Sequence, residues 1–197
     1  MADDLKALRE AARRCQDCPL WANATQTVFG EGAPRARVML VGEQPGDEED
    51  RNGHPFIGPA GRLLDRALEA AGIDRGELYV TNAVKHFKWE PRGKRRLHKT
   101  PAQREIDACH QWLEGEIRVL KPRVIVCLGA TAAKAVIGPA FKVSTMRGRF
   151  VASAAAPKVF ATFHPSALLR LRGDEEREAA FQQFVKDLSL IRKGLQA

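Results

Sequence analysis

Four short apolar segments, each followed by residues with helical periodicity, constrain the fold of this 197-residue chain more than any other feature. We expect strands at residues 37–42, 78–84, 123–129 and 158–163. We expect helices at residues 3–14, 62–71, 101–120, 131–137 and 174–192, with Thr100 and Pro101 at the start of the third. Strands that alternate with helices predict a three-layer α/β sandwich with a central parallel sheet of about four strands. No linker or repeat divides the chain, so we expect one domain over residues 1–197.

Composition excludes several classes of protein. Hydrophobic residues make up 44% of the chain and charged residues 28%, which is ordinary for a soluble globular protein. The first residues, MADDLKALREAARR, lack the apolar region of a secretory signal. No apolar run approaches the roughly 20 residues that a membrane-spanning helix needs. We therefore expect a cytoplasmic protein with no membrane partner, and nothing in the sequence requires more than a monomer.

The positive charge of the chain is concentrated in one stretch, residues 85–100. This stretch holds seven lysines and arginines against the single Glu90, so it carries six of the eight net positive charges. Phe87 and Trp89 are interleaved with the charge, and Pro91 with Gly93 excludes a continuous helix. Cations bind phosphates and aromatic faces stack on bases, so the stretch predicts a nucleic-acid-binding loop. A solvated basic loop is the plainer explanation of the charge alone.

His98 lies inside this basic stretch. Neighbouring cations disfavour a second positive charge, so they should hold the imidazole neutral and nucleophilic near pH 7. A neutral imidazole next to a DNA backbone is able to attack an electrophilic carbon. His98 is therefore a candidate nucleophile as well as a contact residue.

Polar side chains follow three of the predicted strands. Glu43 follows the first strand, Asn82 lies near the end of the second, and His164 follows the fourth. Each has an ordinary explanation, as a helix-capping partner, a turn former or a strand-closing residue. In open α/β sheets, however, ligands bind at the carboxyl ends of the strands, and these ends should also bring in Phe56 and His98.

Together these side chains can cut an N-glycosidic bond. An amide pairs with the edge of a pyrimidine, and an aromatic ring stacks on its face. A histidine stabilises the negative charge of a departing base, and a carboxylate stabilises a developing sugar cation. Such chemistry requires a nucleotide flipped out of the DNA stack.

The four cysteines predict a metal centre. Cys15 and Cys18 form a C-x2-C pair, and Cys109 and Cys127 follow in the middle of the chain. Disulfides are improbable in a reducing compartment, so metal binding is the leading explanation. Spacing alone does not separate zinc from an iron–sulfur cluster, and four unrelated cysteines remain the alternative.

Several motifs resemble the uracil-DNA glycosylase superfamily. They are GEQPGD at residues 42–47, PFIGPAG at 55–61, VTNAVKHF at 80–87 and HPS at 164–166. The cysteines resemble those of the iron–sulfur, family-4-like branch. The sequence GKRRLHK at residues 93–99 resembles an extra loop of the UdgX group, in which a loop histidine attacks the sugar C1′ and remains joined to the DNA.

The resemblance implies a role for each site residue. His98 would be the nucleophile, Glu43 its orienting partner, and His164 the group that stabilises the leaving uracil, with Gln44 in a supporting catalytic role. Asn82 would recognise the uracil edge and Phe56 would stack on the ring. Further contacts to the substrate would come from Gly42, Lys94, Arg95, Arg96 and Arg170. Cys15, Cys18, Cys109 and Cys127 would hold a structural [4Fe–4S] cluster.

Three other functions remain open at this stage. In an ordinary uracil-DNA glycosylase water would attack, and His98 would only contact phosphate. A non-catalytic module would bind uracil-containing DNA, single- or double-stranded, without releasing uracil. A zinc-stapled nucleic-acid-binding protein would be colourless after purification, whereas an iron–sulfur protein would be brown.

Overall fold

A computed structural model describes residues 2–196, so Met1 and Ala197, the ends of the predicted domain, lie outside it. Its main sheet has the order β1-β3-β2-β6-β7. The strands are β1 (Glu31–Gly32), β2 (Val38–Gly42), β3 (Tyr79–Asn82), β6 (Val124–Leu128) and β7 (Lys158–Thr162). The last four strands are parallel, as the sequence predicts, and the two-residue β1 adds an antiparallel edge. The single-domain assignment stays a prediction.

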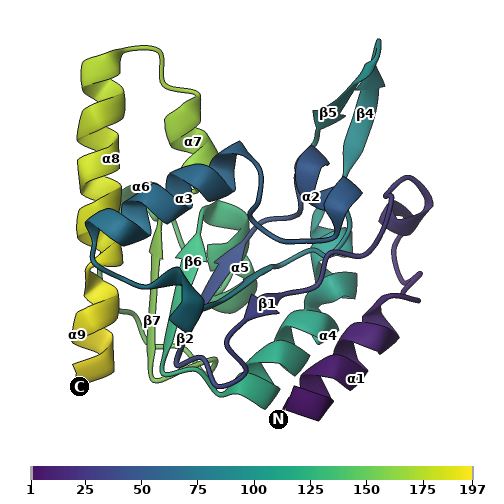
Figure 1. The fold of residues 1–197 in the computed structure, drawn as a ribbon, viewed down its shortest axis with the longest axis horizontal. Helices are drawn as coiled ribbons and strands as arrows, with labels where there is room; N and C mark the ends of the chain where they lie inside the picture. The colour runs from purple at the N-terminus through teal and green to yellow at the C-terminus, as the bar shows by residue number, and fades with distance from the viewer. Residues whose placement is uncertain (1, 197) are drawn as a thin grey trace.

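Helices cover both faces of the sheet (Figure 1). On one face lie α3 (Pro59–Ala70), α7 (Pro165–Leu169), α8 (Asp174–Leu188) and α9 (Leu190–Gln196). The other face carries α1 (Ala2–Ala12), α4 (Gln103–Leu120) and α5 (Ala130–Val136). Smaller elements are α2 (Asp47–Asn52), α6 (Val143–Met146) and the 3-10 turns at Pro19–Ala22 and Arg75–Glu77. Among residues 2–196, no helix is both long and apolar enough to cross a bilayer.

Alternation along the central strands creates two separate cores. In β2, Val38 and Leu40 face the α3/α8 side, whereas Met39 and Val41 face the α4/α5 side. All five residues of β2 are buried, because helices cover both faces of a parallel sheet. The three-layer sandwich expected from the sequence is therefore confirmed.

Several boundaries differ from the prediction. Helix α4 begins at Gln103 instead of Pro101, because the Glu105 carboxylate accepts a hydrogen bond from the Ala102 N–H at 2.6 Å and closes the first turn. The last predicted helix divides into α8 and α9 at Ser189. No helix was predicted over α2, whose first turn is acidic and so matches the positive helix N-terminus.

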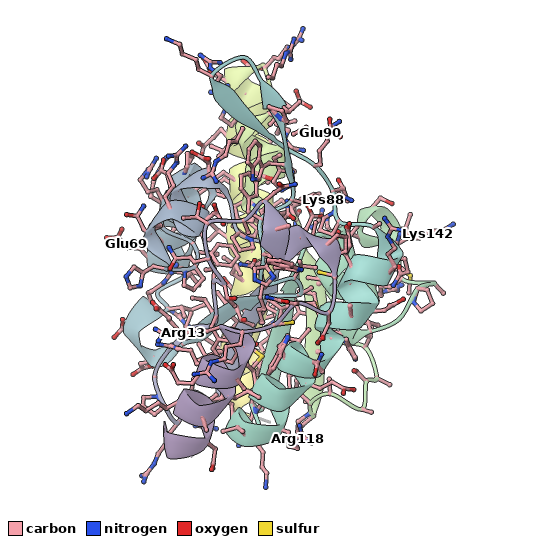
Figure 2. The ribbon with its side chains drawn as sticks, turned by 90° about the vertical axis from the view of Figure 1, so that its right-hand side faces the viewer. Arg13, Glu69, Lys88, Glu90, Arg118 and Lys142 are labelled. Atoms are coloured by element: carbon pink, nitrogen blue, oxygen red, sulfur yellow. The ribbon has the colours of Figure 1, made fainter. Side chains whose placement is uncertain are left out.

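The basic stretch forms a β-hairpin instead of an irregular loop. Strands β4 (Trp89–Arg92) and β5 (Arg95–His98) pair in antiparallel register around a two-residue turn. Gly93 occupies the first turn position with φ of 59°, a conformation that glycine adopts without strain. The hairpin projects away from the sheet in Figure 1, and Figure 2 labels Glu90 on strand β4.

A fully buried ion pair links the end of β3 to helix α4. Lys85 Nζ lies 2.7 Å from Glu116 Oε2, and the two side chains are 1% and 0% exposed. The Glu116 carboxylate also accepts hydrogen bonds from Tyr79 Oη, Thr81 Oγ1 and the Gly30 N–H. Lys85 Nζ donates further to Thr81 Oγ1 and the Asn82 carbonyl. Both charges are thus paired and hydrogen-bonded, as burial requires.

Replacing Glu116 by glutamine should destabilise the protein strongly, because Lys85 would remain buried without a counter-charge. We expect the free energy of unfolding to fall by about 3–5 kcal/mol in urea denaturation. Glu10→Gln, which breaks an exposed Arg13–Glu10 pair, is the matched control and should cost less than about 1 kcal/mol. Equal effects of the two substitutions would contradict the role given to the buried pair.

Candidate active site

A cavity of about 400 Å³ opens at the carboxyl ends of the strands, between helices α2, α3 and α7 and the hairpin. The residues predicted from sequence that line it are Gln44, Phe56, Asn82, His98, His164 and Arg170. Glu43 lies behind His98, with its Oε1 3.5 Å from His98 Nε2. The parallel strands therefore bring these separate segments together, as their positions in the sequence suggest.

Asn82 ends strand β3 and offers an unpaired acceptor. The residue is 2% exposed, and among the described side chains, those of residues 4–196, its Oδ1 is the only buried nitrogen or oxygen without a hydrogen-bond partner. A buried polar atom without a partner is costly, so its presence indicates a ligand that donates a hydrogen bond. Gly42 packs against both the Asn82 amide and the Phe56 ring. A Cβ at residue 42 would overlap these two side chains.

Phe56 has a strained backbone. Its φ of 58° lies in the left-handed region, which bulky residues rarely adopt, and its side chain is 5% exposed. The ring faces the His164 ring with centroids 6.3 Å apart. Strain of this kind persists where the surrounding structure imposes it, commonly at ligand sites. The geometry fits a platform for a flat ligand.

His164 precedes helix α7 and is held in one orientation by it. Its Nδ1 accepts a hydrogen bond from the Ser166 N–H at 3.1 Å and lies 2.8 Å from Ser166 Oγ. Since Nδ1 is an acceptor, the neutral ring carries its proton on Nε2. Burial, helped by the nearby His98 and Arg170, lowers the pKa of His164 to about 4. His164 is therefore a neutral hydrogen-bond donor at pH 7.

His98 ends strand β5, and its imidazole is also kept neutral. Partial burial of the ring, whose side chain is still 39% exposed, is the largest cause that lowers its pKa below 6.5; Glu43 opposes this shift and Arg170 adds to it. The sequence predicted a neutral ring because of cations within the basic stretch. The structure confirms the direction but assigns it mainly to burial. The result is an imidazole with a free lone pair beside a carboxylate.

Gln44 connects the cavity to the base of the hairpin. Its Oε1 accepts from the Lys88 N–H at 3.0 Å, and its Nε2 donates to the carbonyls of Lys88 and Lys99 at 3.3 and 3.0 Å. Lys88 lies near the base of the hairpin in Figure 2. The Gln44 amide thus hydrogen-bonds to the two residues that flank the hairpin strands. These bonds hold His98 in place, and they occupy polar atoms of Gln44 that could otherwise contact a ligand.

Arg96 docks the hairpin onto helix α2. Its guanidinium forms ion pairs with Asp47 and, at 2.6 Å, with Asp50, and it lies over the rings of Phe87 and Trp89. The side chain is only 12% exposed. We expected Arg96 to contact DNA, but its donors are occupied by carboxylates, because the strand alternation turns it toward the protein. Its contacts hold the segment that carries His98.

The other predicted contact residues remain on the surface. Lys94 and Arg95 are exposed at the tip of the hairpin, and Arg92 beside them is exposed as well. Arg170 is exposed at the rim of the cavity, next to Leu169, which is 43% exposed. These side chains are free to meet a polyanion that enters the cavity.

Three of the four cysteines gather beside the end of β3. Burial raises the pKa of Cys109 to about 12, and the neighbouring Cys18 and Cys15 contribute to the rise. N–H groups point at the sulfurs: Trp112 Nε1 donates to Cys15 Sγ at 3.3 Å, and the Lys85 N–H to Cys109 Sγ at 3.2 Å. Such bonds stabilise thiolates that bind a metal. None of the described His, Cys, Asp and Glu side chains form a group of three ready for a single metal ion.

Cys127 does not join this group. It lies in the middle of β6, 0% exposed, and packs in the core between the sheet and α4/α5. Cys109 and Cys18 belong to a different cluster with Leu20 and Val84. The number and spacing of the cysteines in the sequence could not reveal that Cys127 lies apart, because they do not show which face of strand β6 its side chain occupies.

His86 is a residue that the sequence reasoning missed. It directly follows Lys85, whose N–H contacts Cys109, and its ring is 5% exposed. Its Nε2 lies 2.9 Å from Thr27 Oγ1, which also donates to the Ala12 carbonyl. The Cys15 N–H donates to the same carbonyl, so His86 is linked through Thr27 to the segment that carries Cys15 and through Lys85 to Cys109. Its position inside the VTNAVKHF motif was the available signal.

Comparison with known proteins assigns the family. The model of the family described as "Uracil DNA glycosylase superfamily" matches residues 29–189, which include the whole cavity. The chain belongs to the uracil-DNA glycosylase superfamily. It is 39% identical over 190 residues to a type-4 uracil-DNA glycosylase of Thermotoga maritima, covering 96% of this chain and 95% of the relative.

Two further relatives come from Pyrobaculum aerophilum. A type-4 uracil-DNA glycosylase is 38% identical over 187 residues, with 90% of this chain and 92% of the relative covered. A type-5 uracil-DNA glycosylase is 33% identical over 165 residues, with 75% and 69% covered. The likeness to type-4 proteins therefore extends over nearly the whole length of this superfamily member.

The low pKa of His164 should make stability depend on pH. The folded state cannot protonate this ring until about pH 4, whereas the unfolded chain does so near 6.5. The contribution of His164 to the free energy of unfolding is therefore full above pH 6.5 and is lost as the pH falls toward 4. Compared with His164→Asn, we expect the wild type to lose roughly 2–3 kcal/mol more over this interval. Urea denaturation at each pH measures the difference, which should be constant above about pH 7.5; parallel curves down to pH 4 would contradict the assignment.

Proposed function

We propose that this protein excises uracil from DNA and then captures the abasic sugar covalently through His98, as the resemblance to the UdgX group implies. The observation that carries the proposal is the His98 imidazole, neutral and 3.5 Å from Glu43, held at the cavity by a docked hairpin. The kinship with type-4 uracil-DNA glycosylases supports the excision step. The extra hairpin supports the capture step.

Recognition would use the cavity floor. The unpaired Asn82 Oδ1 accepts a hydrogen bond from the N–H on the uracil edge, and Phe56 stacks on the ring. Gly42 has no side chain, so the Asn82 amide and the Phe56 ring both pack directly against it, and a Cβ there would displace them. The base must be flipped from the duplex or come from a single strand to reach this depth.

Bond cleavage would separate charge across the cavity. The C1′–N1 bond breaks, its electron pair leaves with uracil, and an oxocarbenium ion forms on the sugar. The Nε2–H of His164 donates to the developing uracil anion, and the Glu43 carboxylate stabilises the sugar cation. The fixed orientation of His164, with Nδ1 bound to Ser166, supports this assignment.

Capture would follow from the position of His98. The imidazole lone pair attacks C1′ and forms a carbon–nitrogen bond, and the ring then loses its other N–H proton, which balances the charge of the departed uracil. An imidazole held at the reacting carbon has a high effective concentration relative to water. Because the product has no easy leaving group, one protein molecule would act once.

The exposed cations would hold the DNA strand. Arg92, Lys94 and Arg95 are exposed at the hairpin tip, and Arg170 lies at the rim of the cavity. Lysine and arginine contacts to phosphate supply affinity without sequence preference. Uracil-containing DNA is therefore the proposed partner, and the expectation of a monomer stays a prediction.

The cysteine group would hold a [4Fe–4S] cluster that ties the N-terminal segment to helix α4. Cys15, Cys18 and Cys109 fit as ligands, since their thiols gather and receive N–H donors. Cys127 is left out of this proposal, because its side chain lies in the other core. We assign the fourth ligand to His86, whose buried imidazole contacts Thr27 beside the segment of Cys15 and which directly follows Lys85, whose N–H contacts Cys109. The cluster would supply rigidity at the end of β3 and no step of the reaction.

Iron content should separate these ligands. Purified wild-type protein should be brown, and Cys109→Ser and His86→Ala should lose most of the iron. His86→Cys should restore it, because a thiolate also binds iron. Cys127→Ala is the matched control and should keep both colour and iron. A colourless Cys127→Ala protein, or full iron in His86→Ala, would contradict the assignment; zinc in a colourless wild type would replace the cluster altogether.

Covalent capture is tested by mixing the protein with a short uracil-containing oligonucleotide and separating the denatured products on a gel. Wild type should give a slower band in which protein and DNA are joined, and His98→Ser should give none while still releasing uracil. His110→Ser, which removes an exposed histidine on helix α4, is the control and should give the full band. An oligonucleotide with thymine in place of uracil should stay unmodified.

The other outcomes point to the alternatives. Release of many uracils per protein molecule without a shifted band would make this an ordinary glycosylase that uses water. Binding without uracil release would leave only a non-catalytic binding module.

A further inference from the structure

The carboxylate of Glu43 has a second partner that the proposed reaction does not use. Thr131, the second residue of helix α5, donates a hydrogen bond from its Oγ1 to Glu43 Oε2. The other carboxylate oxygen, Oε1, is the one that lies 3.5 Å from His98. One oxygen is therefore bound to the scaffold and the other faces the nucleophile.

The backbone before Thr131 fixes this arrangement. Gly129 turns strand β6 into helix α5 with φ of 91°, and its N–H donates to the Thr162 carbonyl on β7. A Cβ at Gly129 would overlap His164. The turn therefore also places the start of α5 in contact with His164. Thr131 is 8% exposed, and a buried β-branched side chain has few rotamers to choose from.

We propose that Thr131 is a positioning residue of the reaction: its hydroxyl holds the Glu43 carboxylate so that Oε1 faces C1′ and His98. The inference rests on the proposed function, since it concerns the group that stabilises the sugar cation. A free carboxylate would rotate about its last bond and divide its time between orientations. Holding one oxygen fixes the charge where the cation forms, which is how preorganised sites lower a barrier.

The test is the rate of uracil release with protein in excess over DNA. Thr131→Val keeps the shape but removes the hydroxyl, and we expect release to slow about tenfold or more. Thr131→Ser restores the hydroxyl and should recover most of the rate. Ser153→Ala removes a hydroxyl that binds the Val136 carbonyl near the other end of α5, and it should leave the rate unchanged.

A double-mutant cycle shows whether Thr131 acts through Glu43. In a Glu43→Gln background, Thr131→Val should change the rate by less than about twofold, because the group that it holds is already altered. A purely structural defect would instead slow both backgrounds equally. Thermal unfolding of each variant confirms that the compared proteins are folded.

The outcomes separate this inference from the proposed function. If wild type releases uracil and Thr131→Val is as fast, or Thr131→Ser is as slow as Thr131→Val, the positioning role is wrong while the glycosylase proposal stands. If wild type releases uracil without forming an adduct, the capture step fails and the Thr131 comparison still holds. If wild type releases no uracil, both fail.

Discussion

The buried pair between Lys85 and Glu116 is the interaction on which the site depends. It fixes the end of β3 against α4, and three consequences follow from that one anchor. The Lys85 ammonium binds the Asn82 carbonyl, so the backbone that carries the Asn82 amide is held rigidly. The Lys85 N–H points at Cys109, and the chain continues directly into the hairpin that carries His98. A buried charge pair satisfied by several hydrogen bonds permits one arrangement, where an apolar contact would allow sliding.

The hairpin shows how a charged segment serves two purposes. Strand alternation sends Arg96 inward to the carboxylates of Asp47 and Asp50, while Lys94 and Arg95 at the tip stay in solvent. The inward cation and the amide of Gln44 set the position of His98. The outward cations are free to bind phosphate. A count of charges along the sequence cannot separate these two roles, because it does not show on which face of a strand each side chain lies.

Electrostatics and shape act together in the cavity. Burial keeps both His98 and His164 neutral, so one remains able to attack and the other to donate a proton. Glu43 is the carboxylate that contacts His98, with Oε1 3.5 Å from Nε2, and in the proposed reaction it would stabilise the sugar cation. The strained Phe56 packs directly on Gly42, where a Cβ would displace its ring. In the proposed function these features would serve separate steps, namely recognition, cleavage and capture.

The sequence by itself determined the α/β class, the four parallel strands and the residues that gather at their ends. Apolar periodicity is a local property, and parallel strands bring their ends together without further information. The sequence could not determine that the basic stretch is a hairpin, that Arg96 turns inward, or that Cys127 lies away from the other cysteines. It also gave no sign of the contact between Thr131 and Glu43. Those outcomes depend on which faces meet after folding, and side chains 46 residues apart, as Asp50 and Arg96 are, acquire their partners only in the tertiary structure.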